Sequence, residues 1–250
     1  MTALRVVAHV HSEWSYDGRW SLRDIARAFE QRGYDAVLLS EHDRGFDADR
    51  WHAYRDECAT ASTARTLLVP GIEYSDPTNT VHVPVWGQLP FLGEAVATGD
   101  LLRRVGELGG VSVLAHPARR NAFEHIDDES LSYLTGIELW NRKYDGYAPS
   151  KVAIELLRRR PSLLPVVGLD FHTARQFHPL AMMIASSNER SAAAICTALR
   201  GGGARAMAFG LPAATLASGL ALPAMCGLER ARRGVAAQIR AARQQRRIRA

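Results

Sequence analysis

The chain has 250 residues, of which 47% are hydrophobic and 23% are charged, and both values are ordinary for a globular protein. This length can bury a full core, so one α/β domain is the simplest expectation. The three cysteines are widely spaced and form no CxxC motif, which argues against a disulfide framework and against a thiolate zinc site. Because the N-terminus also lacks the pattern of a signal peptide, we expect a cytoplasmic protein.

Charge is unevenly distributed along the chain. The formal net charge is +5, but residues 229–250 contain eight arginines and one glutamate, so residues 1–228 carry a net charge of −2. Basicity is therefore a property of the C-terminal tail.

Short apolar runs rich in Val, Ile and Leu alternate with amphipathic stretches. The runs are 5–11, 36–42, 66–73, 111–117, 136–141, 165–172, 180–186 and 204–210, and seven of them have the composition of buried strands. A further strand is expected over 81–87. Helical patterns cover 21–32, 49–62, 94–108, 149–160 and 191–200. This alternation predicts a mainly parallel α/β barrel or a doubly wound sheet.

Side chains that can bind metal ions follow the predicted strands, where barrel enzymes carry their reactive groups. His9 and His11 are two residues apart on the first strand, so regular strand geometry places both on one side. Asp170 and His172 repeat this spacing. The complete candidate set is His9, His11, Asp17, His42, Glu73, His82, His116, Asp170 and His172.

One such residue alone would usually be a satisfied polar group or part of a loop. Here six of the nine histidines of the chain lie at predicted strand ends. A cluster of desolvated histidines and carboxylates is unfavourable unless cations neutralise it. The set therefore predicts a metal centre, and its nitrogen and oxygen ligands suit zinc, manganese or iron without ranking them.

The motifs HVHS at 9–12, SEHD at 40–43, GIE at 71–73, AHP at 115–117 and GLDFH at 168–172 carry a family resemblance. Together with Asp17 and His82 they resemble the polymerase and histidinol phosphatase (PHP) family of metal-dependent phosphoesterases over about residues 5–190. The resemblance implies a distorted (βα)7 TIM-like barrel. The expected organisation is a PHP domain over 1–210, followed by an apolar and then arginine-rich extension, the basic helical tail, over 211–250.

The resemblance also implies a division of the candidate ligands among two or three divalent ions. One ion would take His9, His11, Glu73 and Asp170, a second Glu73 with His82 and His116, and a third Asp17, His42 and His172. Glu41 departs from the family pattern, in which Asp is frequent. Because this residue precedes the ligand, only its supporting role is affected.

The expected activity is hydrolysis of a phosphomonoester or phosphodiester, with a metal-bound, bridging water or hydroxide as nucleophile. GxSxG and HCx5R-type signatures of covalent catalysis are absent. Four arginines near the ligand-bearing strand ends are candidates for phosphate contacts, with solvated surface as the alternative: Arg19, Arg44, Arg119 and Arg142. Asp43 and Glu138 could orient ligand imidazoles, although a cap or loop hydrogen bond serves equally well for Asp43.

Several alternatives stay open. A small phosphorylated substrate is the first expectation, a nuclease acting on nucleic-acid ends the second and a phosphotyrosine-protein phosphatase the third. A structural metal-binding PHP module is the non-enzymatic alternative, and the complete ligand set argues against it. Residues 206–228 are uncharged and could be read as a membrane anchor, but Pro212 and Pro223 oppose this. The arginine-rich tail suits contact with nucleic acid or an anionic membrane, or a solvated, partly disordered terminus.

Overall fold

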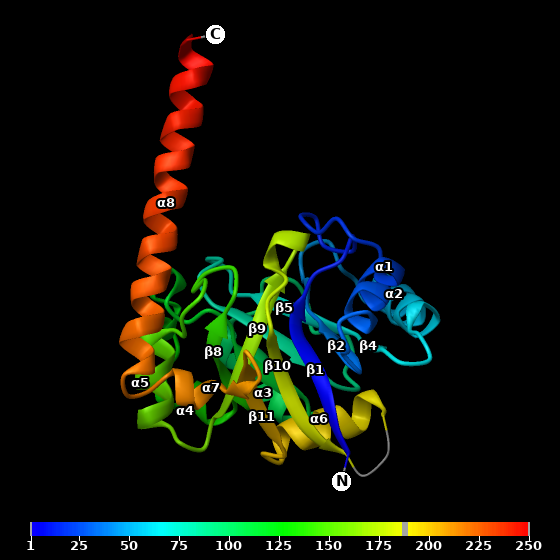
Figure 1. The fold of residues 1–250 in the computed structure, drawn as a ribbon. Helices are drawn as coiled ribbons and strands as arrows, with labels where there is room; N and C mark the ends of the chain where they lie inside the picture. Colours follow the sequence, from blue (N-terminus) through cyan, green and yellow to red (C-terminus); the bar gives the residue numbers. More distant parts are fainter. Residues whose placement is uncertain (1, 187–189, 250) are drawn as a thin grey trace.

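The computed structural model describes residues 2–186 and 190–249, and within them one large sheet forms the centre of the protein (Figure 1). The sheet has 12 strands in the order β12-β11-β10-β1-β9-β8-β7-β6-β5-β3, with β2 paired to β1 and to β4. The strands are β1 (Thr2–Val10), β2 (Ala36–Leu39), β3 (Glu41–His42), β4 (Leu67–Val69), β5 (Gly71–Ser75), β6 (His82–Trp86), β7 (Val111–Leu114), β8 (Gly136–Asn141), β9 (Leu164–Phe171), β10 (Leu180–Ser186), β11 (Ala204–Ala208) and β12 (Leu211–Pro212).

Parallel pairing dominates the part of the sheet that carries the candidate ligands. β1 pairs in parallel with β2 and β9, and β8 pairs in parallel with β7 and β9. The pairs of β6 with β5 and β7 are antiparallel, as are those of β10 with β1 and β11. The mixed α/β class is thus confirmed. The strand order is that of an open sheet, and a closed TIM-like barrel is not shown.

Helices lie on the outer faces of this sheet (Figure 1). They are α1 (Leu22–Glu30), α2 (Ala48–Ala61), α3 (Thr98–Glu107), α4 (Asp128–Ser132), α5 (Lys151–Arg159), α6 (Ala192–Arg200), α7 (Ala213–Leu216) and α8 (Ala221–Arg249), with short 3₁₀ turns η1 (Arg119–His125) and η2 (Ala174–Gln176). Ser21, Ser150 and Ser191 cap α1, α5 and α6 by accepting a backbone N–H in the first turn. The five predicted helices are therefore present.

The helix predicted over 94–108 begins later, at Thr98. Ala95 has a left-handed φ of 52°, which a right-handed helix cannot include, and its N–H donates to the Asp43 carboxylate at 3.0 Å.

Burial of the predicted strands explains their formation, because β2, β6, β7 and β8 are buried along their whole length.

Three candidate ligands have left-handed backbone conformations, which non-glycine residues rarely adopt: His9 (φ 60°), His116 (φ 29°) and Asp170 (φ 49°). At His9 the pairing of β1 with both neighbours shifts between Ala8 and Val10, as in a β-bulge. Each such conformation costs about 1–3 kcal/mol and persists only where the surrounding structure enforces it. The sheet therefore bends its backbone at the candidate site.

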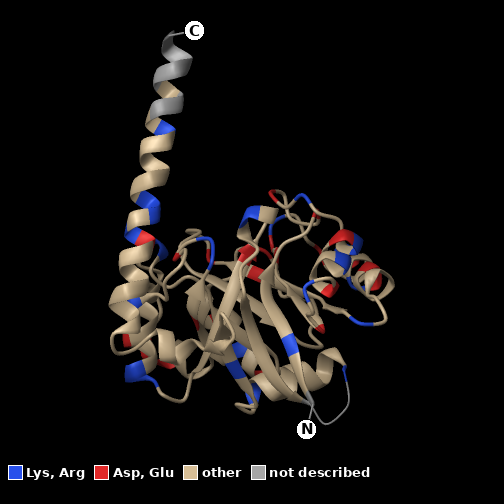
Figure 2. Ribbon diagram, in the orientation of Figure 1, with Lys and Arg blue, Asp and Glu red and all other residues tan. Residues whose placement is uncertain are grey.

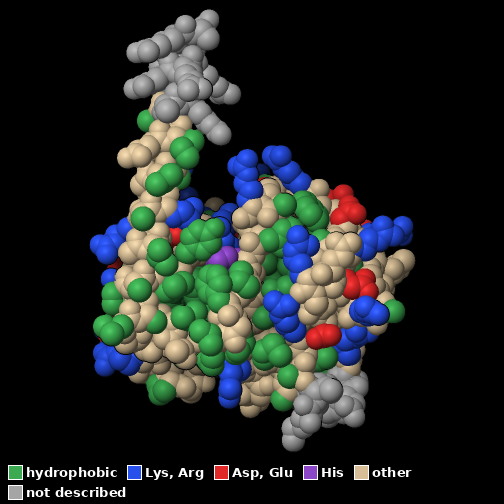
Figure 3. Space-filling model, in the orientation of Figure 1, with side chains coloured by type: hydrophobic (Ala, Val, Ile, Leu, Met, Phe, Trp, Pro, Cys, Tyr) green, Lys and Arg blue, Asp and Glu red, His purple; other side chains and the backbone are tan. Residues whose placement is uncertain are grey.

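The C-terminal segment forms α8, a helix of 29 residues that rises from the body and projects past it (Figure 1). Its length is about 43 Å at 1.5 Å per residue. Large apolar side chains are exposed near its start, at Phe209, Leu211, Leu220 and Leu228, and Figure 3 shows apolar side chains gathered on this face. None of the helices in the described part of the chain is long and apolar enough to cross a membrane. The domain boundary at 210 stays a prediction.

Candidate metal centre

The nine predicted ligands come from separate strands and loops and meet around the carboxylate of Glu73, a buried residue of β5. Its oxygens lie 3.0–3.6 Å from a ring nitrogen of each of five histidines: His9, His11, His42, His82 and His116. Parallel strands bring their carboxyl ends to one edge of the sheet, and this edge collects the side chains. The tertiary structure thus unites residues that are up to 163 positions apart in sequence.

Asp170 and Asp17 complete the cluster on two sides. An oxygen of Asp170 lies within 4.0 Å of His9, His11, His116 and His172. Asp17 lies 3.3 Å from His42 Nε2 and 3.1 Å from His172 Nε2. Its side chain is 38% exposed, whereas those of Glu73 and Asp170 are nearly inaccessible, so Asp17 faces the mouth of the cluster.

Three groups of ligand atoms are close enough together to hold a metal ion each. They are His11 with His42 and His172, His9 with His11 and Asp170, and His9 with Glu73 and His116. These groups overlap with the three sets expected from the PHP resemblance but differ in detail, since His82 and Asp17 belong to none of them. Their role as ligands stays a prediction.

Hydrogen bonds from Nδ1 orient three of the imidazole rings. A carboxylate only accepts, so His9 Nδ1–H donates to Glu138 Oε1 at 2.7 Å. His172 Nδ1–H donates to the backbone carbonyl of Asp170 at 2.9 Å. His11 Nδ1–H donates to Ser15 Oγ at 3.2 Å, because that hydroxyl already gives its own proton to Glu41.

The opposite nitrogens of these rings point at the carboxylates. Buried Nε2 of His9 and buried Nε2 of His11 have no hydrogen-bond partner, although Glu73 oxygens lie 3.3 Å and 3.6 Å away. A lone pair aimed at a carboxylate is repelled unless a proton or a cation lies between them. The donor set therefore fits divalent metal ions, with Nδ1 held by an acceptor and Nε2 directed inward.

The electrostatics of the cluster are those of buried, opposed charges. Burial favours the neutral form of Glu73, yet the charge of His9 and other imidazoles holds its pKa well below the usual range. Burial lowers the pKa of His42, but hydrogen bonds to Asp17 and Glu73 raise it to about 10. Burial and neighbouring imidazoles lower the pKa of His11 well below its usual value. A divalent ion would therefore compete with protons for these atoms.

Glu138 makes the contacts that its predicted orienting role requires. It is fully buried on β8, where it receives His9 Nδ1–H, and its second oxygen accepts the His116 backbone N–H at 2.8 Å. Asp43 instead accepts the backbone N–H groups of Ser75 and Ala95, which is the loop hydrogen bonding named as its alternative.

Glu41 also lies behind the ligands. It is fully buried and accepts hydrogen bonds from the Ser12 backbone, the Ser12 hydroxyl and the Ser15 hydroxyl. Burial raises its pKa, against these hydrogen bonds. Through Ser15, which contacts His11 Nδ1 and accepts from the His42 backbone, Glu41 orients the surroundings of two candidate ligands. Sequence reasoning did not predict the two serine contacts.

Lys143 is the functional candidate that sequence reasoning missed. Its Nζ lies 3.0 Å from Asp170 Oδ1 and 3.4 Å from His172 Nε2. The charge of Asp170 raises its pKa against the effect of burial. Tyr144 follows, with its ring centroid 4.5 Å from that of His116. The available signal was position alone, because both residues lie within three positions of the end of the strand 136–141.

Two of the four predicted arginines lie beside the cluster. Arg119 Nη1 is 3.2 Å from His82 Nε2. Arg19 lines a cavity of about 560 Å³ together with Asp17, Lys143 and His172. Their contact with phosphate stays a prediction.

The other two arginines contact aromatic rings. Arg44 lies 5.9 Å from the ring of Tyr16, which stacks on His42. Arg142 lies 4.6 Å over the Tyr147 ring, and none of its described contacts reaches the cluster. The Arg142 side chain is half-buried, its Nε is inaccessible to solvent, and the Tyr147 ring beneath it also contacts Arg232 of α8.

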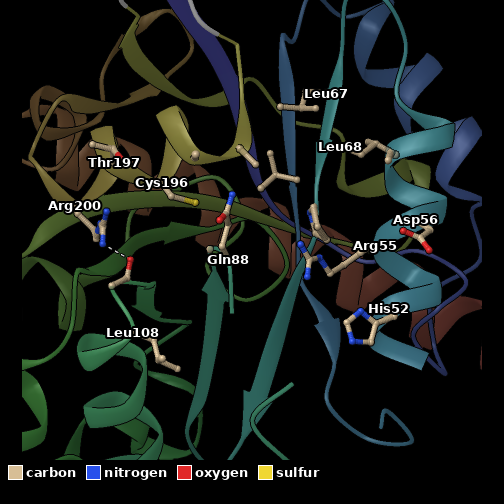
Figure 4. A pocket seen from close by; sticks show the side chains of 17 residues that line it. His52, Arg55, Asp56, Leu67, Leu68, Gln88, Leu108, Cys196, Thr197 and Arg200 are labelled. Carbon is tan, nitrogen blue, oxygen red and sulfur yellow. Dashed lines mark hydrogen bonds between the residues drawn. The ribbon is translucent and has the colours of Figure 1, made fainter. Parts of the chain in front are cut away.

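A second cavity lies apart from the cluster. It has a volume of about 690 Å³ and is lined by residues of α2, β4 and α6, among them His52, Arg55 and Cys196 (Figure 4). None of the nine candidate ligands lines it. Cavity size alone therefore does not select the candidate site, which is defined by the convergence of possible ligand atoms.

Comparisons with known proteins support the fold. No protein-family model matches the chain, and no curated protein matches it either. The crystal structure of PsfC from Pseudomonas syringae PB-5123 resembles it with a TM-score of 0.63 and 16% identity, covering 94% of this chain and 99% of that chain. This likeness shows a shared fold.

Two weaker likenesses are to other solved structures. One is to a protein from Bifidobacterium adolescentis, described provisionally as a metal-dependent phosphoesterase (TM-score 0.47, 17% identity, 67% of this chain and 87% of that chain). The other is to an amidohydrolase from Chromobacterium violaceum (TM-score 0.45, 15% identity, 68% and 88%). With TM-scores below 0.5 they carry no argument about function. The fold and the cluster together define an α/β protein with a candidate metal centre.

Proposed function

We propose that the protein is a metal-dependent phosphoesterase of the PHP type. The observation that carries this proposal is that the six candidate histidines each lie against Glu73 or Asp170, with Asp17 against two of them, and that three imidazoles are held through Nδ1 so that Nε2 faces the carboxylates. Buried clusters of this composition are costly without cations. The proposed cofactors are two or three divalent ions, of zinc, manganese or iron.

Bound divalent ions would supply charge neutralisation for phosphate oxygens and a nucleophilic water at neutral pH. The residues of the chain supply the rest. Lys143 and Arg119 add positive charge at the edge of the cluster, where both lie within 3.4 Å of a candidate ligand. Asp17, the most exposed of the three carboxylates, leaves this edge accessible. A small phosphorylated compound in the cytoplasm is the proposed substrate.

The distorted seven-stranded barrel is part of the same proposal. Its support is the pairing around the ligands, since β1 lies between β2 and β9, and β2 and β4 are followed within two residues by β3 and β5. The parallel pair of β3 with β5 then leads to β6, β7 and β8.

The test is hydrolysis by the purified protein loaded with manganese or zinc. Substrates should include an aryl phosphate, nucleotides, sugar phosphates, a phosphotyrosine peptide and short oligonucleotides. His42→Ala and Asp170→Ala should each lose bound metal and activity together. His52→Ala is the matched control, because this histidine lies in α2 at a distance from the cluster and should keep both. Absence of hydrolysis on every substrate, or full activity in either ligand variant, contradicts the proposal.

A nuclease is the second candidate because of α8. The described part of the helix carries Arg230, Arg232, Arg233 and Arg240, and the helix projects on the side of the body where β1 ends (Figures 1 and 2). Positive charge on an extended element attracts the phosphate backbone of nucleic acids. Deletion of residues 234–250 should then weaken oligonucleotide binding and its dependence on salt. Unchanged oligonucleotide cleavage after this deletion argues against the role of the helix.

A further inference from the structure

The first turns of α8 are attached to the loop that enters the candidate metal centre. Glu229 is only 5% exposed, and its carboxylate accepts the Tyr147 backbone N–H at 3.0 Å. Arg233 donates to the backbone carbonyl of Tyr144 at 2.9 Å. Both contacts bridge more than 80 positions of sequence, so this attachment is tertiary and specific.

The approach of the two elements is close enough to require glycine. A Cβ atom on Gly146 would lie 2.3–2.4 Å from the carboxylate atoms of Glu229, and Gly146 also has a left-handed φ of 75°. Arg232 and Arg233 both pair with the same carboxylate. Burial raises the pKa of Glu229, but hydrogen bonds from Arg232, Arg233 and the Tyr147 N–H lower it to about 2. Glu229 is therefore ionised and buried, and it holds α8 against the loop.

The loop itself is fixed from within by Asn141 at the end of β8. Asn141 Oδ1 accepts the backbone N–H groups of Lys143 at 3.0 Å and Tyr144 at 3.1 Å. The Asp145 carboxylate accepts the Asn141 N–H at 2.8 Å, and Trp140 donates to the Gly146 carbonyl. These bonds form a tight turn. The Tyr144 carbonyl and the Tyr147 N–H of this turn are the groups that α8 contacts.

The same turn carries the two side chains that cover the cluster. Lys143 contacts Asp170 and His172, and Tyr144 packs on His116. Arg233 holds the carbonyl of Tyr144, and Glu229 holds the amide three residues later, so α8 fixes the turn directly behind these side chains.

We infer that α8 is a positioning element of the active site and that Glu229 is its positioning residue, holding Lys143 and Tyr144 for contact with the phosphate group of the substrate. This inference rests on the proposed function. Glu229 touches none of the candidate ligands in the described contacts, so its loss should weaken binding of the phosphate group and leave the bound metal in place.

The experiment compares Glu229→Ala with Glu155→Ala in the full-length, metal-loaded protein. Glu155 is a matched control, because it also pairs with arginines three and four residues later, Arg158 and Arg159, but lies exposed on α5 without a loop contact. Hydrogen exchange is followed in peptides that cover 141–147. Bound metal, kcat and KM for an aryl phosphate, and inhibition by inorganic phosphate are measured in parallel.

For Glu229→Ala we expect at least tenfold faster exchange at the Tyr147 amide, unchanged metal content and a 5- to 20-fold rise in KM and in the inhibition constant of phosphate, with kcat changed by less than threefold. Glu155→Ala should match the wild type throughout. If Glu229→Ala does not fold, Arg233→Ala serves as the second variant, because it removes only the contacts of one guanidinium. It should also raise KM, but by a smaller factor.

Unchanged exchange, or unchanged KM and phosphate inhibition in a folded variant, overturns the inference. An equal fall of kcat and metal content also overturns it, because Glu229 would then be merely structural. A wild type that neither hydrolyses phosphate esters nor binds phosphate refutes the proposed function and this inference together. An active wild type with an unaffected Glu229→Ala variant refutes the inference alone.

Discussion

Nδ1 of His9 lies 2.7 Å from Oε1 of Glu138, which belongs to a strand 129 residues further along the chain. Both side chains are almost completely buried. The bond fixes the ring so that Nε2 faces Glu73, and it joins the first candidate ligand to the strand β8. Several consequences can be measured.

Glu138→Ala should lower metal affinity by about 10- to 100-fold, which is the usual effect of removing the acceptor behind a histidine ligand. The physical reason is that the His9 ring loses the partner that sets its tautomer and orientation. Metal titration followed by calorimetry measures the change. Glu107→Ala, which removes an exposed carboxylate of α3, serves as control. Equal affinities in both variants contradict the orienting role.

Gly168→Ala should also disturb the hydrogen bond between His9 and Glu138. A Cβ atom at this position would lie 2.1 Å from Glu138 Oε1 and 3.0 Å from the His9 Cβ. Because both groups are buried, we expect a loss of about 1–3 kcal/mol in the free energy of unfolding, together with weaker metal binding. Denaturant unfolding measures the first effect. Gly203→Ala meets only ordinary contacts, beginning at 3.5 Å, and should change stability by less than about 0.5 kcal/mol.

Glu41→Ala should destabilise the fold by about 2–4 kcal/mol, since it leaves buried donors of Ser12 and Ser15 without an acceptor. Thermal unfolding of the metal-free protein measures this loss without a contribution from bound ions. Glu57→Ala removes an exposed acceptor of Trp14 and should have a much smaller effect. A similar melting temperature for both variants would show that the serines find other acceptors.

The raised pKa of Asp145 predicts that the free energy of unfolding depends on pH between about 4 and 7. Burial, with a contribution from the charge of Glu138, raises its pKa from 3.8 to about 7. The folded protein therefore keeps a proton that the unfolded chain has already lost. The contribution of this group to stability is complete below about pH 4 and is lost as the pH rises towards 7.

The difference in unfolding free energy between the wild type and Asp145→Asn isolates this contribution. The wild type should lose stability relative to the variant as the pH rises from 4 to 7, because Asn carries no titrating proton. Denaturant midpoints measured at three or more pH values in this range provide the check. A difference that is constant with pH would mean that Asp145 titrates normally.

Much of the candidate site could be predicted from sequence because its information is local. His9, His42, Glu73 and Asp170 each follow or end an apolar run, and the carboxyl ends of parallel strands share one edge. Residue type and position along a strand were therefore enough to name the nine residues that the structure brings together. The strands themselves were predictable because buried strands are continuous runs of apolar residues.

The tertiary structure decided what depends on contacts between distant segments. The left-handed backbone at His9 and Asp170 lies where the pairing of β1 with β9 shifts register, which no local pattern encodes. Lys143 is an ordinary lysine after a strand until folding places it 3.0 Å from Asp170. In the sequence, residues 211–250 are recognisable only as an extension that ends in an arginine-rich tail. The tertiary structure shows that Glu229 of this extension contacts the loop at Tyr147. Sequence determined which groups could take part in the chemistry, and packing decided which of them meet, because position in space depends on the whole fold.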